Sequence, residues 1–222
     1  MKKILLGFIV VILLFACTQS PEEKVNLLIK ESMERGLYHP ETYSPAGTRI
    51  DSAFTPFDDP EFYDKTLQLY KLTKEINNYD DYAKSAKRNV AHHQDMLRIF
   101  SNNDSREELN QAKERYNEYI VKKNRAEEKA KKIAAKLNTM LNEEEQFIGF
   151  KVWHRYRADN NAGMTMFGEV KFLMDKDLNS IFALYNTEDE EYKIVESLFK
   201  QMCGEESTSE KINLEDLKFY DE

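Results

Sequence analysis

The chain has 222 residues and a net charge of −8, from 32 Lys and Arg against 40 Asp and Glu. This acidic balance argues against a general nucleic-acid-binding protein, which needs basic patches to displace counterions. It also argues against simple electrostatic attraction to anionic lipid. Charged residues make up 32% of the chain, with only 7 Gly and 5 Pro, which favours long helices flanked by solvent.

Residues 1–16 are predicted to be a signal peptide. Lys2 and Lys3 precede an apolar run from Ile4 to Ala16, which is the arrangement of a signal sequence. A helix of this length rises only about 20 Å, whereas the hydrocarbon core of a bilayer is about 30 Å thick. A permanent membrane span is therefore not expected here.

The stretch Leu14-Phe15-Ala16-Cys17 resembles the lipobox of bacterial lipoproteins, although Phe15 is bulkier than the usual residue at its position. The resemblance implies cleavage before Cys17 and attachment of a diacylglyceryl group to its sulfur, with further acylation, such as palmitate, on the amino group. Two or three chains would hold the protein on its membrane, since stable anchoring needs more than one. The alternative is an ordinary signal peptide with an incidental cysteine. Lipidation would leave Cys203 without a disulfide partner.

Residues 17–58 are predicted to form a helix followed by an extended segment. Ser20 can cap the helix, Pro21 suits its first position and Glu23 completes a capping box. The helix is expected to end near Leu37. Residues 38–60 hold four of the five prolines and predict a turn-rich segment with one short strand at residues 49–54. Residues 25–55 are expected to pack against a sheet.

Residues 59–143 are predicted to form an antiparallel coiled-coil hairpin. Apolar residues recur at alternating steps of three and four in both halves, and the stretch SNNDSREE separates the halves, with Asp104 or Ser105 as the expected cap. The predicted register places Val90 opposite Tyr119, and the second helix is expected to stop near Asn142. The same register places His93 opposite Tyr116 and Ala86 opposite Lys123. The seam positions are Leu69, Leu72, Ile76, Tyr79, Ala83, Ala86, Val90, His93, Leu97, Phe100, Leu109, Ala112, Tyr116, Tyr119, Lys123, Ala126, Ala130, Ile133, Leu137 and Met140.

Residues 144–203 change to a period of two, which predicts a β-meander of at least three antiparallel strands followed by a helix from about residue 188 to residue 202. Residues 204–222 are polar and are expected to be a flexible tail. The predicted fold class is therefore α+β, with the long helical hairpin inserted in a small head made of the meander and flanking helices.

The candidate ligand-binding residues lie at the end of the first meander strand and in its turn. Trp153 offers a stacking face, while Arg155 and Arg157 offer guanidinium forks for an anionic, glycan or peptide ligand. Asn160 and Asn161 would add polar groups from the turn. The alternative is a structural strand face, in which these basic residues pair with neighbours such as Glu169 across the hairpin.

The sequence predicts no catalytic residue, no cofactor and no metal site. It lacks a Gly-rich phosphate loop and the CxxC, HExxH and nucleophile-elbow motifs. His92 and His93 are adjacent and point about 100° apart on a helix, so they cannot chelate together; His93 is expected to bond Tyr116 or water. A hydrolase using Cys203 or His154 is the weakest of the hypotheses.

Over most of its length, the mature chain resembles small lipoproteins of Bacteroidales-type Gram-negative bacteria. The resemblance rests on the lipobox, the segment DSAFTPFDDPEF, the charged helical hairpin, and IGFKVWHRYRADNNAG followed by FLMDKD. It implies a lipid-anchored protein of the cell envelope, with the outer membrane as the expected location. The sequence therefore predicts a non-enzymatic structural or protein-interaction module with an envelope protein as partner and no nucleic acid. The alternative is a glycan- or peptide-binding lipoprotein.

Overall fold

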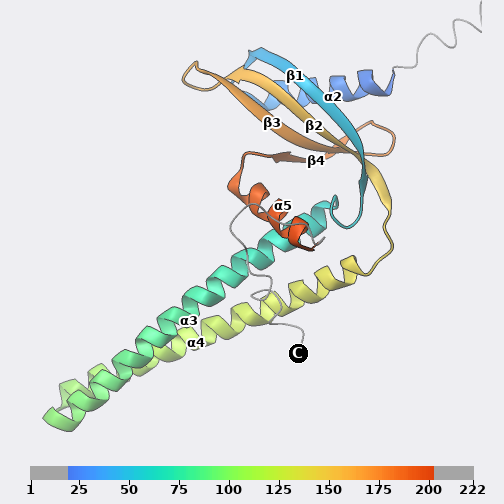
Figure 1. Cartoon of the computed structure of the whole chain (residues 1–222). Coiled ribbons are helices and arrows are strands. Elements are labelled where there is room, and N and C mark those ends of the chain that lie inside the picture. Colours follow the sequence, from blue (N-terminus) through green and yellow to red (C-terminus); the bar gives the residue numbers. More distant parts are fainter. Residues whose placement is uncertain (1–19, 203–222) are drawn as a thin grey trace, which may run out of the picture. The chain divides into compact units, whose positions relative to one another are not determined.

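The computed structural model describes residues 20–202 (Figure 1). Cys17, Cys203 and the predicted tail at residues 204–222 lie outside the described residues. Within this range the fold class is α+β, as predicted, with four helices and a four-stranded antiparallel sheet. None of the described helices combines the length and apolar character that a membrane span requires. The elements in chain order are α2 (Pro21–Gly36), β1 (His39–Phe54), α3 (Pro60–Phe100), α4 (Asn103–Leu141), β2 (Phe147–Asp159), β3 (Thr165–Met174), β4 (Ile181–Asn186) and α5 (Glu190–Met202).

The chain divides into two compact units. One unit contains the described residues up to Phe54 together with Phe147–Asp189, and the other contains Thr55–Gln146 together with the residues from Glu190 onward. The first unit therefore holds α2 and the sheet, and the second holds α3, α4 and α5. We call them the sheet unit and the hairpin unit.

The sheet unit is built by packing α2 on one face of the sheet. The predicted capping box of α2 is present, since the Ser20 side chain accepts a hydrogen bond from the Glu23 N–H and the Glu23 carboxylate accepts one from the Ser20 N–H. Burial of apolar side chains from both elements stabilises this packing at about 25 cal/mol per Å² removed from water. The core consists of Val25, Ile29 and Met33 from α2 and Val152, Val170, Phe172, Met174 and Leu178 from the sheet region.

β1 is longer than the predicted strand at residues 49–54. It begins at His39 and pairs with β2 along its length, with register shifts at three points. Pro40 and Pro45 are tolerated because β1 is an edge strand, where a missing N–H need not break a ladder. The prolines therefore indicated an edge strand with bulges rather than a loop.

The hairpin unit contains two long helices that pack against each other and run in opposite directions. Asp59 caps α3 by accepting a hydrogen bond from the Glu61 N–H. The helix α4 ends with Asn142 as its cap, as predicted. All predicted seam residues are buried or half-buried except Phe100, which is exposed. The two helices bury a continuous apolar core that reaches α5, where Phe199 lies against Phe62.

The predicted register of the hairpin is wrong by about two turns. The ring of Tyr119 lies 5.5 Å from that of Tyr82 rather than opposite Val90. Lys123 likewise meets Asp80 rather than Ala86, at 2.6 Å. The cause is the cap of α4, which is Asn102 and not Asp104 or Ser105.

An early cap leaves little chain between the helices. Ser101 ends α3 in the left-handed conformation, with φ at 46°, and Asn102 caps α4 directly after it. The chain therefore reverses earlier than expected, and every facing pair shifts with it.

Candidate functional site

The predicted ligand-binding residues of β2 lie on the face of the sheet away from α2. Residues alternate between faces along a strand, so Trp153, Arg155 and Arg157 share one face, and His154 lies on the other. The register places Arg49 of β1 and Lys171 of β3 beside Trp153 in one row.

Three cations surround the Trp153 ring. The guanidinium carbon of Arg49 lies 4.1 Å from the ring centroid, and the ammonium groups of Lys171 and Lys151 lie at 5.6 Å and 5.9 Å. Such cation–π contacts stabilise by about 0.5–2 kcal/mol each, depending on desolvation. Arg49 also pairs with Asp51 at 3.1 Å. The side of the indole that Arg49 covers is therefore not available for a sugar ring to stack on.

Arg155 is held by an acid of the neighbouring strand. Its Nε donates to Glu169, and this ion pair raises the pKa of the Arg155 guanidinium further above its ordinary value. The pairing across the β-hairpin is the one that the structural interpretation of this face predicted. Arg157 is exposed and lies opposite Phe167 on β3.

A hollow of about 350 Å³ lies beside Trp153 and Arg155. It forms because Gly47 of β1 stands directly opposite Arg155 and offers no side chain, next to a register shift after Pro45. Both of its arginines are paired, Arg155 with Glu169 and Arg49 with Asp51, so a neutral polar group fits it better than an anion. The lining residues are Ala46, Gly47, Thr48, Arg49, Trp153, Arg155 and Glu169.

The two asparagines of the turn do not join this hollow. The side-chain oxygen of Asn160 accepts hydrogen bonds from the Ala162 and Met164 N–H groups, so it closes the β2–β3 turn. Asn161 is exposed in the same turn. The structure thus brings together Trp153 and Arg155 of the five predicted residues. The structure adds Arg49 to this site. The sequence signal for it was the position of Arg49 and Asp51, two residues apart in a predicted strand, where both share one face.

His154 is buried on the α2 side of the sheet. Its side chain is 1% exposed, its Nε2 lies 2.8 Å from the Tyr43 hydroxyl and its Nδ1 lies 2.9 Å from the Thr48 hydroxyl. Burial lowers the pKa of this imidazole, which keeps it neutral between its two partners. These contacts occupy both ring nitrogens of this buried side chain.

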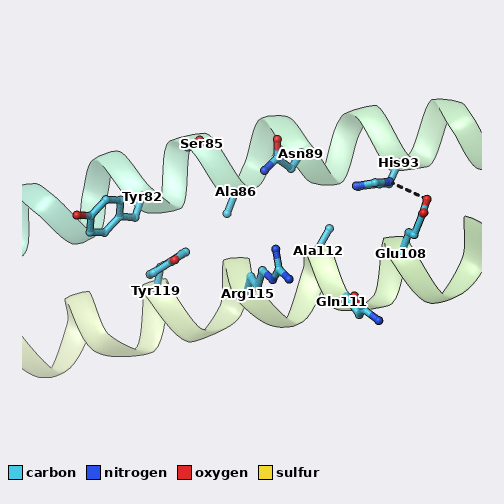
Figure 2. Close-up of a pocket in the computed structure, with 10 residues that line it drawn as sticks. All are labelled: Tyr82, Ser85, Ala86, Asn89, His93, Glu108, Gln111, Ala112, Arg115 and Tyr119. Carbon is cyan, nitrogen blue, oxygen red and sulfur yellow. Dashed lines mark ion pairs between the residues drawn. The ribbon is translucent and has the colours of Figure 1, made fainter.

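A second hollow, of about 250 Å³, interrupts the seam of the hairpin (Figure 2). Ala86 and Ala112 leave space between the helices, and Figure 2 shows the Arg115 side chain reaching into it. His93 Nδ1 lies 3.5 Å from a Glu108 carboxylate oxygen, whereas the sequence predicted a bond to Tyr116 or to water. The described residues contain no group of three His, Cys, Asp or Glu side chains that could hold a metal ion.

No protein-family model, curated protein or solved structure matches the chain significantly.

Proposed function

We propose that the chain is a bacterial envelope lipoprotein, anchored through Cys17 to the outer membrane, whose helical hairpin contacts an envelope protein. In this proposal α3 and α4 form an antiparallel coiled coil inserted between β1 and β2 of the small α+β head. The proposed role of the protein is structural or one of protein interaction, and it involves no reaction step and no cofactor.

The observation that carries the proposal is the apolar end of the hairpin. Ile99 and Phe100 occupy the last turn of α3, where the chain reverses, and Ile99 is 70% exposed. At 1.5 Å per residue, the two helices are about 60 Å long. A soluble hairpin needs no apolar side chains at such an end, whereas adjacent exposed large apolar residues are typical of a contact surface.

The composition of the rest of the hairpin supports the same role. Ion pairs within single helices occupy its outer surface, as between Lys122 and Glu118 at 2.6 Å and between Lys84 and Asp80 at 2.6 Å. Such exposed pairs contribute little to stability, but they keep the sides of the two helices polar. The apolar residues at the hairpin end therefore contrast with the charged surface of the rest of α3 and α4.

The contact is tested by substituting both apolar side chains at the hairpin end. Native electrophoresis of membranes solubilised in mild detergent should place the full chain in a complex larger than the monomer. The double variant Ile99→Ser/Phe100→Ser should run as a monomer with unchanged helix content, because exposed substitutions usually change stability by less than about 0.5 kcal/mol. The control is Phe167→Ser, since Phe167 is exposed to the same degree in the sheet unit. A complex that survives the double variant counts against the proposal.

The anchor is tested separately with Cys17→Ser. The unsubstituted chain should sediment with membranes and resist a high-salt wash, because acyl chains and not charges hold it there. The Cys17→Ser chain should lose this resistance. A variant that stays in the membrane fraction would remove the lipid anchor from the proposal.

The second candidate function is binding of a glycan or peptide at the Trp153 hollow. The hollow itself favours it, and the cover that Arg49 provides favours a peptide over a stacked sugar. Trp153 is the chain's only tryptophan, so its fluorescence reports on this site alone. A fluorescence change on titration with envelope peptides or glycans, abolished by Arg155→Ala, would support this function.

A further inference from the structure

The hollow between α3 and α4, which we call the seam hollow, carries opposite charges two helical turns apart. Among the described residues that line it, Glu108 is the only acid and Arg115 is the only arginine or lysine. They are seven residues apart on α4, so they lie on one side of that helix, about 10 Å apart along its axis. The seam hollow therefore offers a negative group and a positive group at a fixed spacing.

The guanidinium of Arg115 is available to an anion. Figure 2 shows its side chain between the two helices, near Ala86 and Ala112. Within residues 20–202, Arg115 takes part in no ion pair. A guanidinium can hold a carboxylate through two parallel hydrogen bonds. This part of the seam hollow therefore fits a carboxylate.

The carboxylate of Glu108 is available to a cation. One of its oxygens lies 3.5 Å from His93 Nδ1, and its side chain is 59% exposed. This separation is longer than an ordinary N–H···O hydrogen bond, so the contact with His93 does not use up the acceptor sites of the carboxylate. An ammonium group can therefore donate to Glu108 from within the seam hollow.

Small and polar residues line the space between these two charges. Ala86 and Ala112 are buried and fill little of it, while Ser85 and Asn89 of α3 add a hydroxyl and an amide. Hydroxyl and amide groups can bond the N–H and C=O groups of a peptide. The volume of 250 Å³ is below the range of about 300–1,000 Å³ that is typical of pockets for drug-sized ligands. The ligand must therefore be small.

We propose that the seam hollow binds a small zwitterion whose ammonium and carboxylate lie about 10 Å apart, as in a short peptide with free ends. The carboxylate pairs with Arg115 and the ammonium pairs with Glu108. Three residues of extended chain span about 10 Å, so a tripeptide matches the spacing and a single α-amino acid does not. Glu108 repels a doubly charged anion such as phosphate. The site does not include Ile99 or Phe100, and it goes beyond the function proposed above.

The test is isothermal titration calorimetry of the purified full chain with trialanine. Trialanine should bind, and free alanine should bind about tenfold more weakly because it cannot reach both charges. N-Acetylation or C-terminal amidation of trialanine, each of which removes one charge, should also weaken binding about tenfold. A second probe, 8-aminooctanoate, has a similar length without peptide bonds. If it binds as tightly as trialanine, the ligand class is an amino carboxylate, and if it binds more weakly, the class is a peptide.

Paired changes in the chain and in the ligand assign each charge to its partner. Arg115→Ala should weaken binding of trialanine about tenfold but change binding of trialanine amide less than about twofold, because the amide has no carboxylate to lose. Glu108→Gln should have the same selectivity for trialanine over N-acetyl-trialanine. The matched control is Arg125→Ala, which should leave binding unchanged, because Arg125 is exposed on α4 and does not line the seam hollow.

Both substitutions replace exposed residues, so the variants should retain the circular dichroism of the unsubstituted chain. The proposal is overturned if neither trialanine nor 8-aminooctanoate binds, or if trialanine binding survives Arg115→Ala. It is also overturned if Arg115→Ala weakens trialanine and its amide equally, because Arg115 then does not hold the carboxylate.

Discussion

Gly149 lies in β2 with φ at 146°, a conformation that side chains with a Cβ rarely adopt. A Cβ at this position would lie 2.0 Å from the Met174 carbonyl oxygen, which is backbone and cannot move aside cheaply. Both the conformation and the close approach therefore require glycine.

Gly149→Ala is expected to destabilise the protein by at least about 2 kcal/mol, since backbone strain alone costs about 1–3 kcal/mol. The measurement is urea unfolding followed by far-ultraviolet circular dichroism. The control is Gly36→Ala at the end of α2, where no atom lies within 4 Å of an added Cβ. Gly36→Ala should be neutral or stabilising by up to about 1 kcal/mol. Equal effects of the two substitutions would contradict this account of Gly149.

At the same scale, the sequence predicted the shared face of Trp153 and Arg155 because side chains alternate along a strand. It also offered Glu169 as a partner across the hairpin, and the structure confirms the pairing with Arg155. It could not predict that Arg49 covers the indole, because that contact depends on the pairing of β1 with β2, two strands far apart in the chain.

Among the elements, the helical hairpin shows how the position of one helix cap determines many contacts between two helices. The spacing of apolar residues predicted the seam, because a helix places every third or fourth residue on one face. The register depended on a single cap, and Asn102, Asp104 and Ser105 are all good cap residues. The sequence alone could not rank them, and so the facing pairs were predicted wrongly.

The pair between Asp80 and Lys123 predicts an acid sensitivity of the hairpin. The Asp80 carboxylate accepts a hydrogen bond from Lys123 and a second from Lys84, and these bonds lower the pKa of the carboxyl from 3.8 to about 2. A lowered pKa in the folded state means that this contribution to stability is present above pH 3.8 and is lost as the pH falls through about 2. Asp80→Asn removes the contribution at every pH.

The urea midpoint of the full chain should therefore differ between the unsubstituted chain and Asp80→Asn at pH 5, and the difference should shrink near pH 2. Asp81→Asn is the matched control, because Asp81 is more exposed and lies 3.5 Å from Lys84. It should show a smaller difference at pH 5. If Asp80→Asn changes the urea midpoint by the same amount at both pH values, the stabilising role of the Asp80 carboxylate is contradicted.

For the whole molecule, the change of hydrophobic period from helical to alternating, near residue 147, predicted an α+β fold with long helices and a meander. The long strand β1 was predicted only in part, because its partner β2 follows more than 90 residues later, after the whole hairpin. When two paired strands are this far apart in the chain, the sequence near each strand shows only the alternation of its residues and does not indicate the partner strand. The surface proposed for function, the hairpin end, could be recognised only from exposure in the folded chain.

The measurement that tests the central claim most directly is photocrosslinking in intact cells, with a photoreactive residue at position 99 or at position 167. Both side chains are exposed to nearly the same degree, 70% for Ile99 and 69% for Phe167, but they lie in different units. If the hairpin end contacts an envelope protein, position 99 should give one discrete adduct and position 167 should give none of that mass. An adduct at position 167 with none at position 99 would contradict the claim.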